Sequence, residues 1–486
     1  MSSIFLLLVI LLPLLGGVSV SLIPWKKQKS YEIFSFLIVL LTSVIVYVLI
    51  LNPPEQAFVL FQFTGNLKVS FQVDGLSRIF SGLIAVLWPL AMLYAFEYME
   101  HEKHQKIFYT FYIMTYGVTL GISFSDNMMS LYFFYELLTL VTVPLVMHTL
   151  TTEAIIASRK YLYYSLGGAA FAFIGLVLAY VYGNSLTFQM GGVMGGVESH
   201  HTIILLGYVL AFCGFGVKAA IFPFNGWLPT ASVAPTPVTA LLHAVAVVKS
   251  GAFSIMRLTF YIYGAGYLKG SWAQHVVMAI AMVTILYGSS MAVKERHLKR
   301  RLAYSTISNL SYILFGVTLM TPYGLAAALL HMVFHAFMKI TGFFCAGAVL
   351  HKTKRNYVFE LNGLGFKMPV TFGCFLIASL GLVGVPLFPG FLSKWYLAFG
   401  AVKTGDPWAF VGIGVLTISA FLTAIYMLNI VVRAFFLPYE MPAEGIETDP
   451  GWKMKLPLIL FCVAILIMGM HGKPLITLIF KTAGAL

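Results

Sequence analysis

The chain has 486 residues, of which 60% are hydrophobic and only 10% are charged, with a formal net charge of +13. Its mean hydropathy is +0.90. This composition excludes an ordinary soluble globular protein and favours a polytopic membrane protein. Apolar runs of about 20 residues, the length that crosses about 30 Å of hydrocarbon as a helix, recur throughout. The sequence therefore predicts an all-α polytopic protein with a single membrane domain, 1–486.

The first apolar run, 4–23, is predicted to be a retained spanning helix. It has no basic segment before it and no A-x-A cleavage site, and "PWKKQK" follows it, unlike a signal peptide. Thirteen further apolar runs bring the predicted number of spans to fourteen. They lie near 4–23, 31–51, 76–98, 107–125, 129–149, 161–183, 202–222, 238–262, 274–293, 302–320, 324–350, 367–400, 408–432 and 454–472.

Lysine and arginine are distributed unevenly between the predicted loops. Of the 30 basic residues, nineteen fall in loops of one side, six on the other side and five within spans. The positive-inside rule places the richer side inside and both termini outside, in a membrane such as the prokaryotic inner (cytoplasmic) membrane. Anionic lipid at the inner surface then accounts for the net charge without a nucleic-acid partner.

The four cysteines, Cys213, Cys345, Cys374 and Cys462, are widely separated. Without C-x-x-C spacing they disfavour iron–sulfur ligation or a disulfide framework. We expect buried free thiols.

Ionisable residues inside the spans are the main functional signal. A charge at the bilayer centre costs roughly 2.5–3.5 kcal/mol on insertion scales, so such groups are normally paired, hydrated or functional. Nine occur here: Glu136, Lys218, His243, Lys249, Arg257, His331, His335, Lys339 and Lys394. Arg257 is expected near the outer boundary and receives no role.

Glu136, in "LYFFYELLTLVTVPLV", is predicted to accept a hydrogen bond from Lys218 on a neighbouring helix. An opposite charge nearby favours the charged form of both groups, whereas burial alone disfavours it. A pair that opens and closes would therefore control the proton on the lysine. The alternative is a static buried ion pair that only fixes helix packing.

Two spans are expected to be broken. Pro223 and three further prolines follow Lys218 in "IFPFNGWLPTASVAPTP", and Pro386, Pro389 and Gly390 precede Lys394 in "GLVGVPLFPGFLSKWYLAFG". Prolines at this density interrupt helices, and broken helices expose carbonyls that can host water, protons or cations. For the seventh span, an ordinary helix end at the inner surface is the alternative.

Five is an odd number of spans, so a second group of five crosses the membrane in the opposite orientation to the first. Spans 4–8 (107–262) and 9–13 (274–432) are therefore predicted to form inverted repeats. The N-terminal spans, 1–106, and the last span, 454–472, lie outside these repeats.

Between the two breaks, "LLHAVAVVKSGAF" contains His243 and Lys249, and "HMVFHAFMKITGFF" contains His331, His335 and Lys339. The i, i+4, i+8 spacing puts the latter three along one helical face, about 6 Å apart along the axis. Histidine changes charge near neutral pH, so such a row is suited to passing protons. A zinc site is the rival, although no HExxH glutamate or further ligand is in view. Helix-packing hydrogen bonds are a third alternative.

The segments "GFGVKAAIFPFNGWLPTASVAPTPVTALLHAVAVVKSGAF", "KRRLAYSTISNLSYILFG", "HMVFHAFMKITGFFCAG" and "FPGFLSKW", in this order, carry a resemblance. They are similar to the antiporter-like membrane subunits shared by respiratory complex I, membrane-bound hydrogenases and Mrp-type cation/proton antiporters. The resemblance covers nearly the whole chain. It implies fourteen helices, two inverted five-helix repeats, broken seventh and twelfth helices, and a central polar axis that carries protons.

By motif, the resemblance assigns proton translocation to a buried axis. Its residues are Glu136 on the fifth helix, its partner Lys218, Lys249 on the eighth, His331, His335 and Lys339 on the eleventh, and Lys394 on the twelfth near the exit. His243, in the same span as Lys249, is predicted from its place within the span to belong to this axis. Tyr135 departs from the pattern, because complex I members often have tryptophan before this glutamate.

The resulting expectation is a proton-translocating subunit of a complex I-related redox pump or hydrogenase, with exchange of Na⁺ for H⁺ left open. A subunit of an Mrp-type antiporter without redox chemistry is the alternative, followed by a stand-alone transporter or an inactive scaffold. The chain has no GxxxxGK[ST] loop and no cysteine cluster for Fe–S, so we expect no cofactor in it. Fe–S clusters, flavin or a Ni–Fe centre would belong to partner subunits, such as a peripheral Fe–S arm, and other membrane subunits and lipids are further partners.

Overall fold

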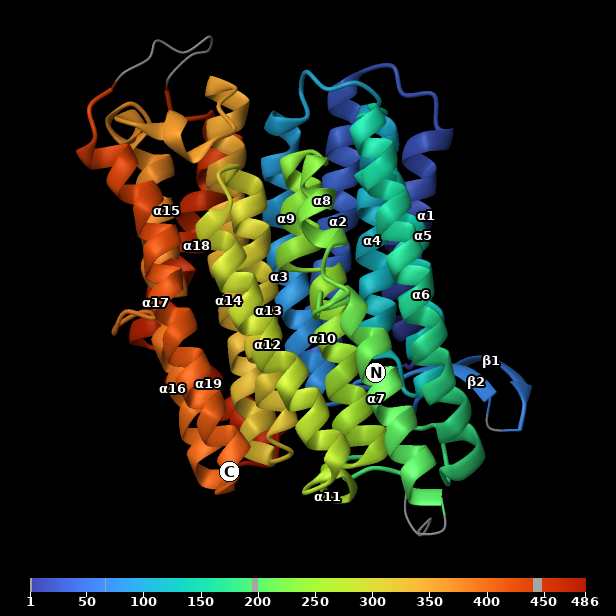
Figure 1. Cartoon of the computed structure of the whole chain (residues 1–486). Helices are drawn as coiled ribbons and strands as arrows, with labels where there is room; N and C mark the ends of the chain where they lie inside the picture. Colours follow the sequence, from blue (N-terminus) through green and yellow to red (C-terminus); the bar gives the residue numbers. More distant parts are fainter. Residues whose placement is uncertain (1, 66, 195–199, 440–447) are drawn as a thin grey trace.

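The computed structural model describes residues 2–65, 67–194, 200–439 and 448–486 as a bundle of long helices that run up and down side by side (Figure 1). Among these residues, twelve helical segments are long and apolar enough to cross a membrane. They are α1 (Ile4–Leu22), α2 (Gln28–Leu51), α3 (Gly75–Tyr98), α4 (Gln105–Phe124), α5 (Met128–Val146), α6 (Thr152–Tyr182), α7 (His201–Lys218), the interrupted segment Thr236–Tyr263, α12 (Trp272–Lys294), α14 (Pro322–Thr353), α17 (Pro407–Phe436) and α18 (Trp452–Met470).

Side-chain caps explain where several of these helices begin. The Asp74 carboxylate accepts from the Ser77 backbone N–H at the start of α3, and the Ser77 side chain caps Asp74 in return. Asn127, Thr151, Ser271, Thr321 and Asp406 cap α5, α6, α12, α14 and α17 in a similar way. Such caps satisfy backbone donors that have no partner within the helix.

Two further predicted spans also coincide with helices. The predicted span 302–320 corresponds to α13 (Leu298–Thr318). This helix is less apolar than the twelve above because it contains many hydroxyl, amide and charged side chains. It packs between α12 and α14. The predicted span 367–400 consists of two shorter helices, α15 (Pro369–Val383) and α16 (Pro389–Thr404).

Both predicted breaks are confirmed. Helix α7 ends at Lys218, five residues before Pro223, and only the short helices α8 (Trp227–Thr230) and η2 (Ala231–Val233) follow before residue 236. The second break, 384–388, contains Pro386 and has positive φ at Gly384 (88°) and Leu387 (77°).

A glycine is required where the chain resumes after the second break. Pro389 and Gly390 begin α16, and a Cβ on Gly390 would lie 1.8 Å from the Gly381 carbonyl oxygen on α15. Any larger residue at position 390 would collide with the backbone of α15, so glycine lets the two half-helices pack closely.

A third interruption was not predicted. The eighth span divides into α9 (Thr236–Ala244) and α10 (Val247–Arg257), followed by the π-helix η3 (Leu258–Tyr263). The N–H groups of Val245 and Ala246 both donate to the Leu241 carbonyl, at 3.2 and 2.9 Å. The break therefore lies between His243 and Lys249.

The chain is mostly helical, as predicted, and one segment outside the bundle forms strands that were not predicted. Strands β1 (Phe58–Thr64) and β2 (Leu67–Phe71) form an antiparallel hairpin, with Phe58 opposite Phe71. The remaining elements are short: α11 (Ala265–Leu268), η4 (Val358–Leu361), η5 (Leu364–Phe366) and α19 (Lys473–Thr482).

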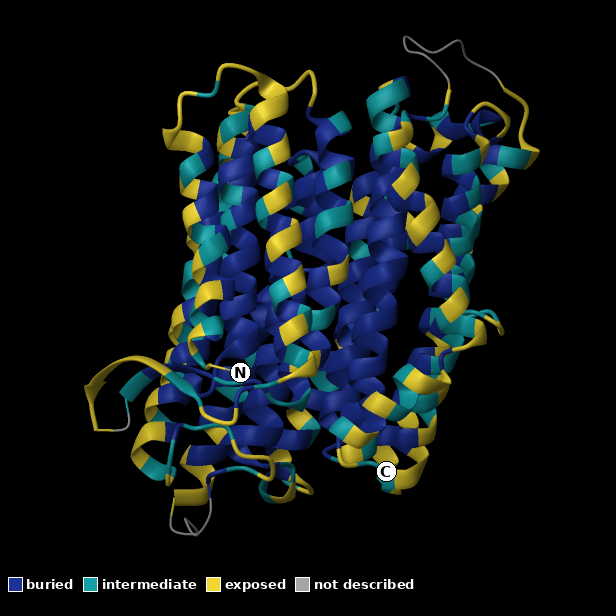
Figure 2. Cartoon of the chain, turned by 180° about the vertical axis from the view of Figure 1, so that it is seen from behind, coloured by how far each residue is buried: buried dark blue, intermediate teal, exposed yellow. Residues whose placement is uncertain are grey.

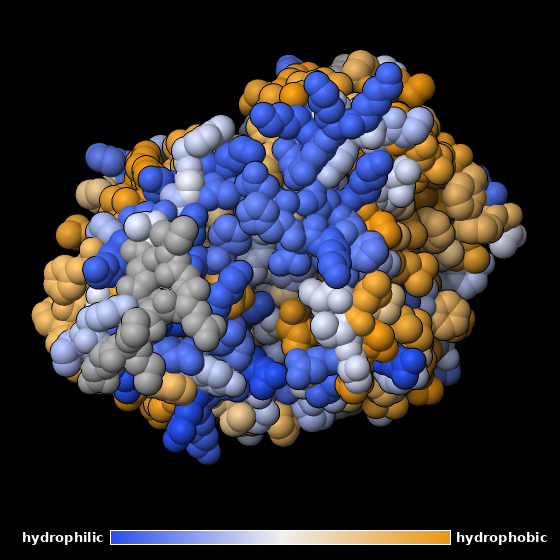
Figure 3. Space-filling model, turned by 90° about the horizontal axis from the view of Figure 1, so that it is seen from above, coloured by the Kyte–Doolittle hydropathy of each residue, from blue (hydrophilic) through white to orange (hydrophobic). Residues whose placement is uncertain are grey.

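The interior of the bundle is buried, and its perimeter is exposed and apolar (Figure 2). Exposed leucine, valine and phenylalanine side chains cover the outward faces of α2, α6 and α17, as lipid contact requires. Both termini lie toward the lower side in Figure 1, whereas the turns 23–27 and 99–104 lie at the top. Viewed from that top side, hydrophilic side chains gather across the face (Figure 3).

Candidate functional site

Lys218 lies at the end of α7, against α5. Its side chain is fully buried, and its ammonium donates to the Tyr135 carbonyl and lies 3.3 Å from the centroid of the Tyr135 ring. In the other direction, the Tyr135 hydroxyl donates to the carbonyls of Gly214 and Phe215, at 3.3 and 3.2 Å. Tyr135 thus joins α5 to the last turn of α7 and holds the cation.

The predicted hydrogen bond between Lys218 and Glu136 is not made. The Glu136 Oε1 atom is buried and has no hydrogen-bond partner, and the two side chains form no ion pair within 4.0 Å. They remain close enough to interact electrostatically. In this structure the carbonyl and the ring of Tyr135, the residue before Glu136, hold Lys218, because Tyr135 faces α7 directly.

Helix α10 crosses the end of α7 at Gly251. A Cβ there would lie 2.6 Å from the Ala219 nitrogen and 3.0 Å from the Lys218 carbonyl carbon. This close approach brings Lys249, two residues earlier on α10, into the same buried region. The Lys249 ammonium lies 2.6 Å from Nδ1 of His335 on α14, and both side chains are fully buried.

His335 stacks on His331 one turn earlier in α14, with ring centroids 5.8 Å apart and an interplanar angle of 16°. Nδ1 of His331 lies 2.9 Å from the Ser393 hydroxyl on α16. Since that hydroxyl donates to the Gly390 carbonyl at 3.1 Å, the network assigns the donor role to His331 Nδ1–H.

The Nε2 atoms of His331 and His335 are both buried and have no hydrogen-bond partner. With Lys249 donating to His335, the tautomers make His335 Nε2–H a donor and His331 Nε2 an acceptor. The two stacked rings therefore carry one Nε2–H donor and one Nε2 acceptor, which form no hydrogen bond with each other in this structure.

Lys394 on α16 lies at the second helix break. Its ammonium donates to the Leu382 and Val383 carbonyls, at 2.7 and 2.8 Å, which are the last carbonyls of α15. It also lies 5.5 Å from the centroid of the Tyr312 ring. The cation therefore occupies the C-terminal end of a half-helix, where partial negative charge favours it.

Lys339 and His243 take no part in these hydrogen bonds. Lys339 donates to the Leu302 carbonyl on α13 at 3.1 Å, and both ring nitrogens of His243 are buried without a partner. The His243 ring packs against Phe343, with centroids 4.9 Å apart. In the contacts observed, Lys249 and not Lys339 continues the histidine row.

Arg257 does have a partner, which the sequence analysis missed. It is 1% exposed and forms a bidentate ion pair with Asp74, the cap of α3. Burial raises the pKa of the Asp74 carboxyl, but the charge and hydrogen bonds of Arg257, with those of Ser77, bring it below its usual value. The pair ties α10 to the beginning of α3 and serves stability.

Two cysteines that are distant in sequence meet in the structure. The Cys462 thiol on α18 lies 3.8 Å from the Cys374 carbonyl on α15. All four cysteines are free, and Cys345, Cys374 and Cys462 are buried. The described residues contain no group of three His, Cys, Asp or Glu side chains that could hold a metal ion.

The arrangement provides proton carriers on successive helices. Lys218, Lys249, His335, His331 and Lys394 come from α7, α10, α14 and α16. Helix α7 packs against α10, and α14 packs against α16. Each group can gain or lose a proton. Direct contacts link Lys249 to His335 and His335 to His331, and Ser393 brings α16 to the same row.

Comparison with protein families gives two matches. The family described as "NADH:quinone oxidoreductase/Mrp antiporter, TM" matches residues 125–423, and "NADH-Ubiquinone oxidoreductase (complex I), chain 5 N-terminus" matches residues 61–109. The first match includes Glu136, Lys218, Lys249, His331, His335 and Lys394.

Curated relatives carry two kinds of name. NADH-quinone oxidoreductase subunit N of Desulforudis audaxviator is 30% identical over 429 residues, covering 85% of this chain and 84% of the relative. A probable K(+)/H(+) antiporter subunit of Rhizobium meliloti is 32% identical, covering 83% of this chain and 40% of the relative. A Na(+)/H(+) antiporter subunit of Alkalihalophilus pseudofirmus is 34% identical, covering 68% and 42%. The chain thus spans less than half of these two antiporter subunits.

Solved structures have the same fold. A chain of the membrane-bound sulfane sulfur reductase, an archaeal respiratory membrane complex, superposes with a TM-score of 0.87 at 24% identity and covers 100% of this chain and 98% of its own. A chain of the Mrp complex from Dietzia sp. DQ12-45-1b superposes with a TM-score of 0.85 at 22% identity and covers 100% and 97%. The chain, with its buried lysines and histidines, is therefore an antiporter-like membrane subunit of the NADH:quinone oxidoreductase/Mrp antiporter family.

Proposed function

We propose that the chain translocates protons as one membrane subunit of a multisubunit complex related to complex I. The observation that carries this proposal is the contact of Lys249 with His335, at 2.6 Å, in a fully buried row that continues to His331 and Ser393. A buried amine beside a histidine with an unpartnered Nε2 can hand on a proton, whereas a purely structural lysine needs only a fixed acceptor.

In the proposed mechanism, a charge change in a neighbouring subunit moves Lys218 between Tyr135 and Glu136. The changed charge shifts the proton on Lys249 toward His335 by repulsion. His335 passes a proton from Nε2 to His331, and Lys394 releases one toward the outer side. Moving one proton outward against 100 mV requires about 2.3 kcal/mol, so partner subunits must supply the drive.

The proposed architecture has fourteen spans, with inverted repeats in spans 4–8 and 9–13, and both termini outside. Other membrane subunits are the expected partners, since the two solved relatives are chains of multisubunit membrane complexes. A redox-driven complex would add a peripheral arm with Fe–S clusters, flavin or a Ni–Fe centre.

A cation/proton antiporter without redox chemistry is the second candidate, favoured by the relatives named as K(+)/H(+) and Na(+)/H(+) antiporter subunits. The match to 84% of subunit N, against 40% and 42% of those two antiporter subunits, favours the first candidate.

Two measurements test the proposal. Lys218→Ala should abolish acidification of inverted native membrane vesicles while the subunit still assembles; Lys269→Ala, an exposed lysine, is the matched control. Unchanged acidification in Lys218→Ala would refute the role of the lysine.

Purification in mild detergent, with mass spectrometry of the co-purifying subunits and assays for metals and flavin, separates the two candidates. An iron–sulfur arm supports the redox-driven complex. Recovery with only small membrane subunits supports the antiporter.

A further inference from the structure

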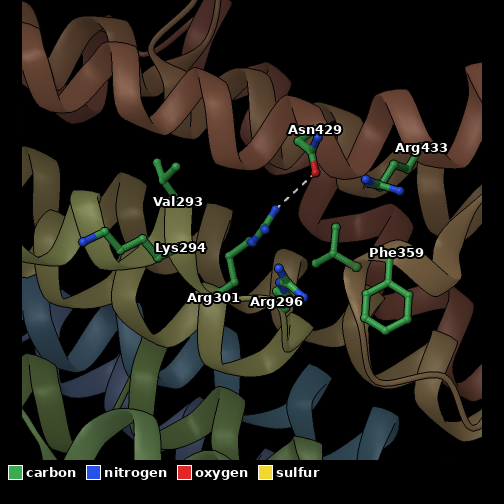
Figure 4. Close-up of a pocket in the computed structure, with 8 residues that line it drawn as sticks. Val293, Lys294, Arg296, Arg301, Phe359, Asn429 and Arg433 are labelled. Atoms are coloured by element: carbon green, nitrogen blue, oxygen red, sulfur yellow. Dashed lines mark hydrogen bonds between the residues drawn. The ribbon is translucent and has the colours of Figure 1, made fainter.

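A pocket of about 490 Å³ opens near η4, where α12 and α17 end and α13 begins, on the upper face in Figure 1. It is lined by Val293, Lys294, Arg296, Arg301, Val358, Phe359, Asn429 and Arg433 (Figure 4). Four of these eight side chains are cationic and none is acidic. None of them takes part in the proton-carrying row.

Among the described residues, the hydrogen bonds of two pocket cations, Arg301 and Arg433, go to neutral acceptors. Arg301 is buried and donates from Nε to the Glu295 carbonyl at 2.8 Å, and from Nη1 to the Tyr426 carbonyl at 3.2 Å and the Asn429 side chain at 3.4 Å. Arg433 donates to Asn362 Oδ1 at 3.2 Å. The ion pairs found among the described residues lie elsewhere.

Among the described residues, two carboxylates lie close in sequence to the lining residues, Glu295 and Glu360, and neither lines the pocket. The Glu360 carboxylate accepts from the backbone N–H groups of Asn356 and Tyr357, at 2.9 and 2.8 Å. Glu295 interacts electrostatically with Arg301, but its Oε1 accepts from the His297 backbone N–H at 2.9 Å, and Glu295 does not line the pocket. Among the described residues, the four cations that line the pocket therefore outnumber the two acids beside it. Like charges held together in this way are unfavourable unless an anion joins them.

Exposed apolar side chains lie along the two helices that end at the pocket. Helices α12 and α17 pack against each other. The exposed side chains Val276 and Val283 on α12, and Ile418, Ile425 and Val432 on α17, recur every seven residues and follow one face of each helix. Phe359, at the rim, is 51% exposed. A ligand with an anionic head group and apolar tails would match a cationic pocket beside exposed apolar helix faces.

We propose that the pocket binds the phosphate of an anionic phospholipid, of the phosphatidylglycerol class. Arg296, Arg433 and Lys294 provide charged donors to the phosphate oxygens, and the immobilised Arg301 provides fixed positive charge behind them. Guanidinium groups suit this role because their donors match phosphate oxygens in pairs. Basic pockets between helices at an inner membrane surface have the position that such headgroups occupy.

Binding is tested on the full chain, purified in mild detergent with its accompanying subunits and then delipidated. Short-chain phosphatidylglycerol, short-chain phosphatidylcholine and inorganic phosphate are titrated separately, with native mass spectrometry and the thermal unfolding midpoint as readouts. The variant Arg296→Gln/Arg433→Gln is compared with Lys27→Gln/Lys103→Gln, which removes two exposed cations from the same face.

We expect phosphatidylglycerol to bind and to raise the unfolding midpoint of the wild type more than phosphatidylcholine. The Arg296→Gln/Arg433→Gln variant should bind it about thirtyfold more weakly, which corresponds to about 2 kcal/mol. The control variant should bind as the wild type does. If the double variant does not fold, Lys294→Gln, at an exposed position, should still weaken binding about fivefold.

Three results would overturn the proposal: equal binding of phosphatidylcholine, equal weakening in the control variant, or full stabilisation by inorganic phosphate alone, which would make this a small-anion site. Binding does not require proton flux, so the outcome is independent of the translocation proposal.

Discussion

The Lys249 ammonium lies 2.6 Å from Nδ1 of His335, and this contact joins α10 to α14 inside the bundle. Neither residue has water-exposed surface. A proton on this pair therefore has two adjacent bases to occupy, and its position responds to charges on either side.

Lys249→Met and His335→Gln should each reduce proton translocation strongly, because each removes one base of the pair. The double variant should lose less than the sum of the single losses, with a coupling energy between about 0.5 and 3 kcal/mol. The initial rate of vesicle acidification measures this, with Lys269→Met as the control. Strictly additive losses would mean that the two residues act independently.

Tyr135 is predicted to hold Lys218 through its ring. Tyr135→Phe keeps the ring 3.3 Å from the ammonium and removes only the hydroxyl bonds to α7. Tyr135→Leu removes a desolvated cation–π contact worth about 2 kcal/mol, roughly a thirtyfold change in the population of this lysine position. Translocation should thus remain in Tyr135→Phe and fall in Tyr135→Leu. Equal rates in the two variants would rule out a role for the ring.

Ser393 is predicted to fix the tautomer of His331 as a positioning residue. Ser393→Ala leaves the Nδ1–H without its acceptor, at a cost of about 1–3 kcal/mol for a buried donor. The histidine is then free to change tautomer, so translocation should slow and its pH profile should shift. Ser393→Thr keeps the hydroxyl and should restore both. A rate loss in both variants with no shift in profile would indicate packing alone.

The Asp74–Arg257 pair should make stability depend on acidic pH. Because the folded structure lowers the pKa of Asp74, the carboxylate stabilises the fold at pH values above the unfolded pKa of about 3.9. This stabilisation is lost as the pH falls through the folded value. The thermal unfolding midpoint, measured from pH 7 to pH 3, should decrease at the acidic end.

Asp74→Asn should lower the free energy of unfolding by about 3–5 kcal/mol at neutral pH, since Arg257 stays buried without its partner. The difference in stability between the variant and the wild type should become smaller at acidic pH. Asp406→Asn is the matched control, because Asp406 also caps a helix but pairs only with partly exposed His275, at 3.3 Å. It should change stability by about 1 kcal/mol or less. A similar loss in both variants would argue for lost capping as the cause.

Much of the fold was predictable because apolar run length and proline carry strong local information. The ends of α3 and α4 fall within two residues of the ends of the predicted spans. Proline and glycine residues indicated the positions of both predicted breaks. The β-hairpin was overlooked, although "FVLFQFTGNLKVSF" combines β-branched and aromatic residues with a Gly-containing turn.

The break after Ala244 had no such signal. "LLHAVAVVKS" contains neither proline nor glycine, and the interruption depends on packing between helices. Tertiary contacts also decided the partners of the buried ions. Lys218 bonds to a backbone carbonyl, Lys249 reaches across to α14, and Arg257 finds an aspartate 183 residues away. Spacing along one helix cannot reveal contacts between helices.

The two hydrogen bonds of Lys394 have a consequence for what happens when that lysine loses its charge. An ammonium has three N–H donors, and the neutral amine keeps two, the number that the Leu382 and Val383 carbonyls require. Deprotonation can therefore leave the end of α15 fully bonded. The closing of this helix terminus therefore does not depend on the charge of Lys394, since both carbonyls keep a donor in either protonation state.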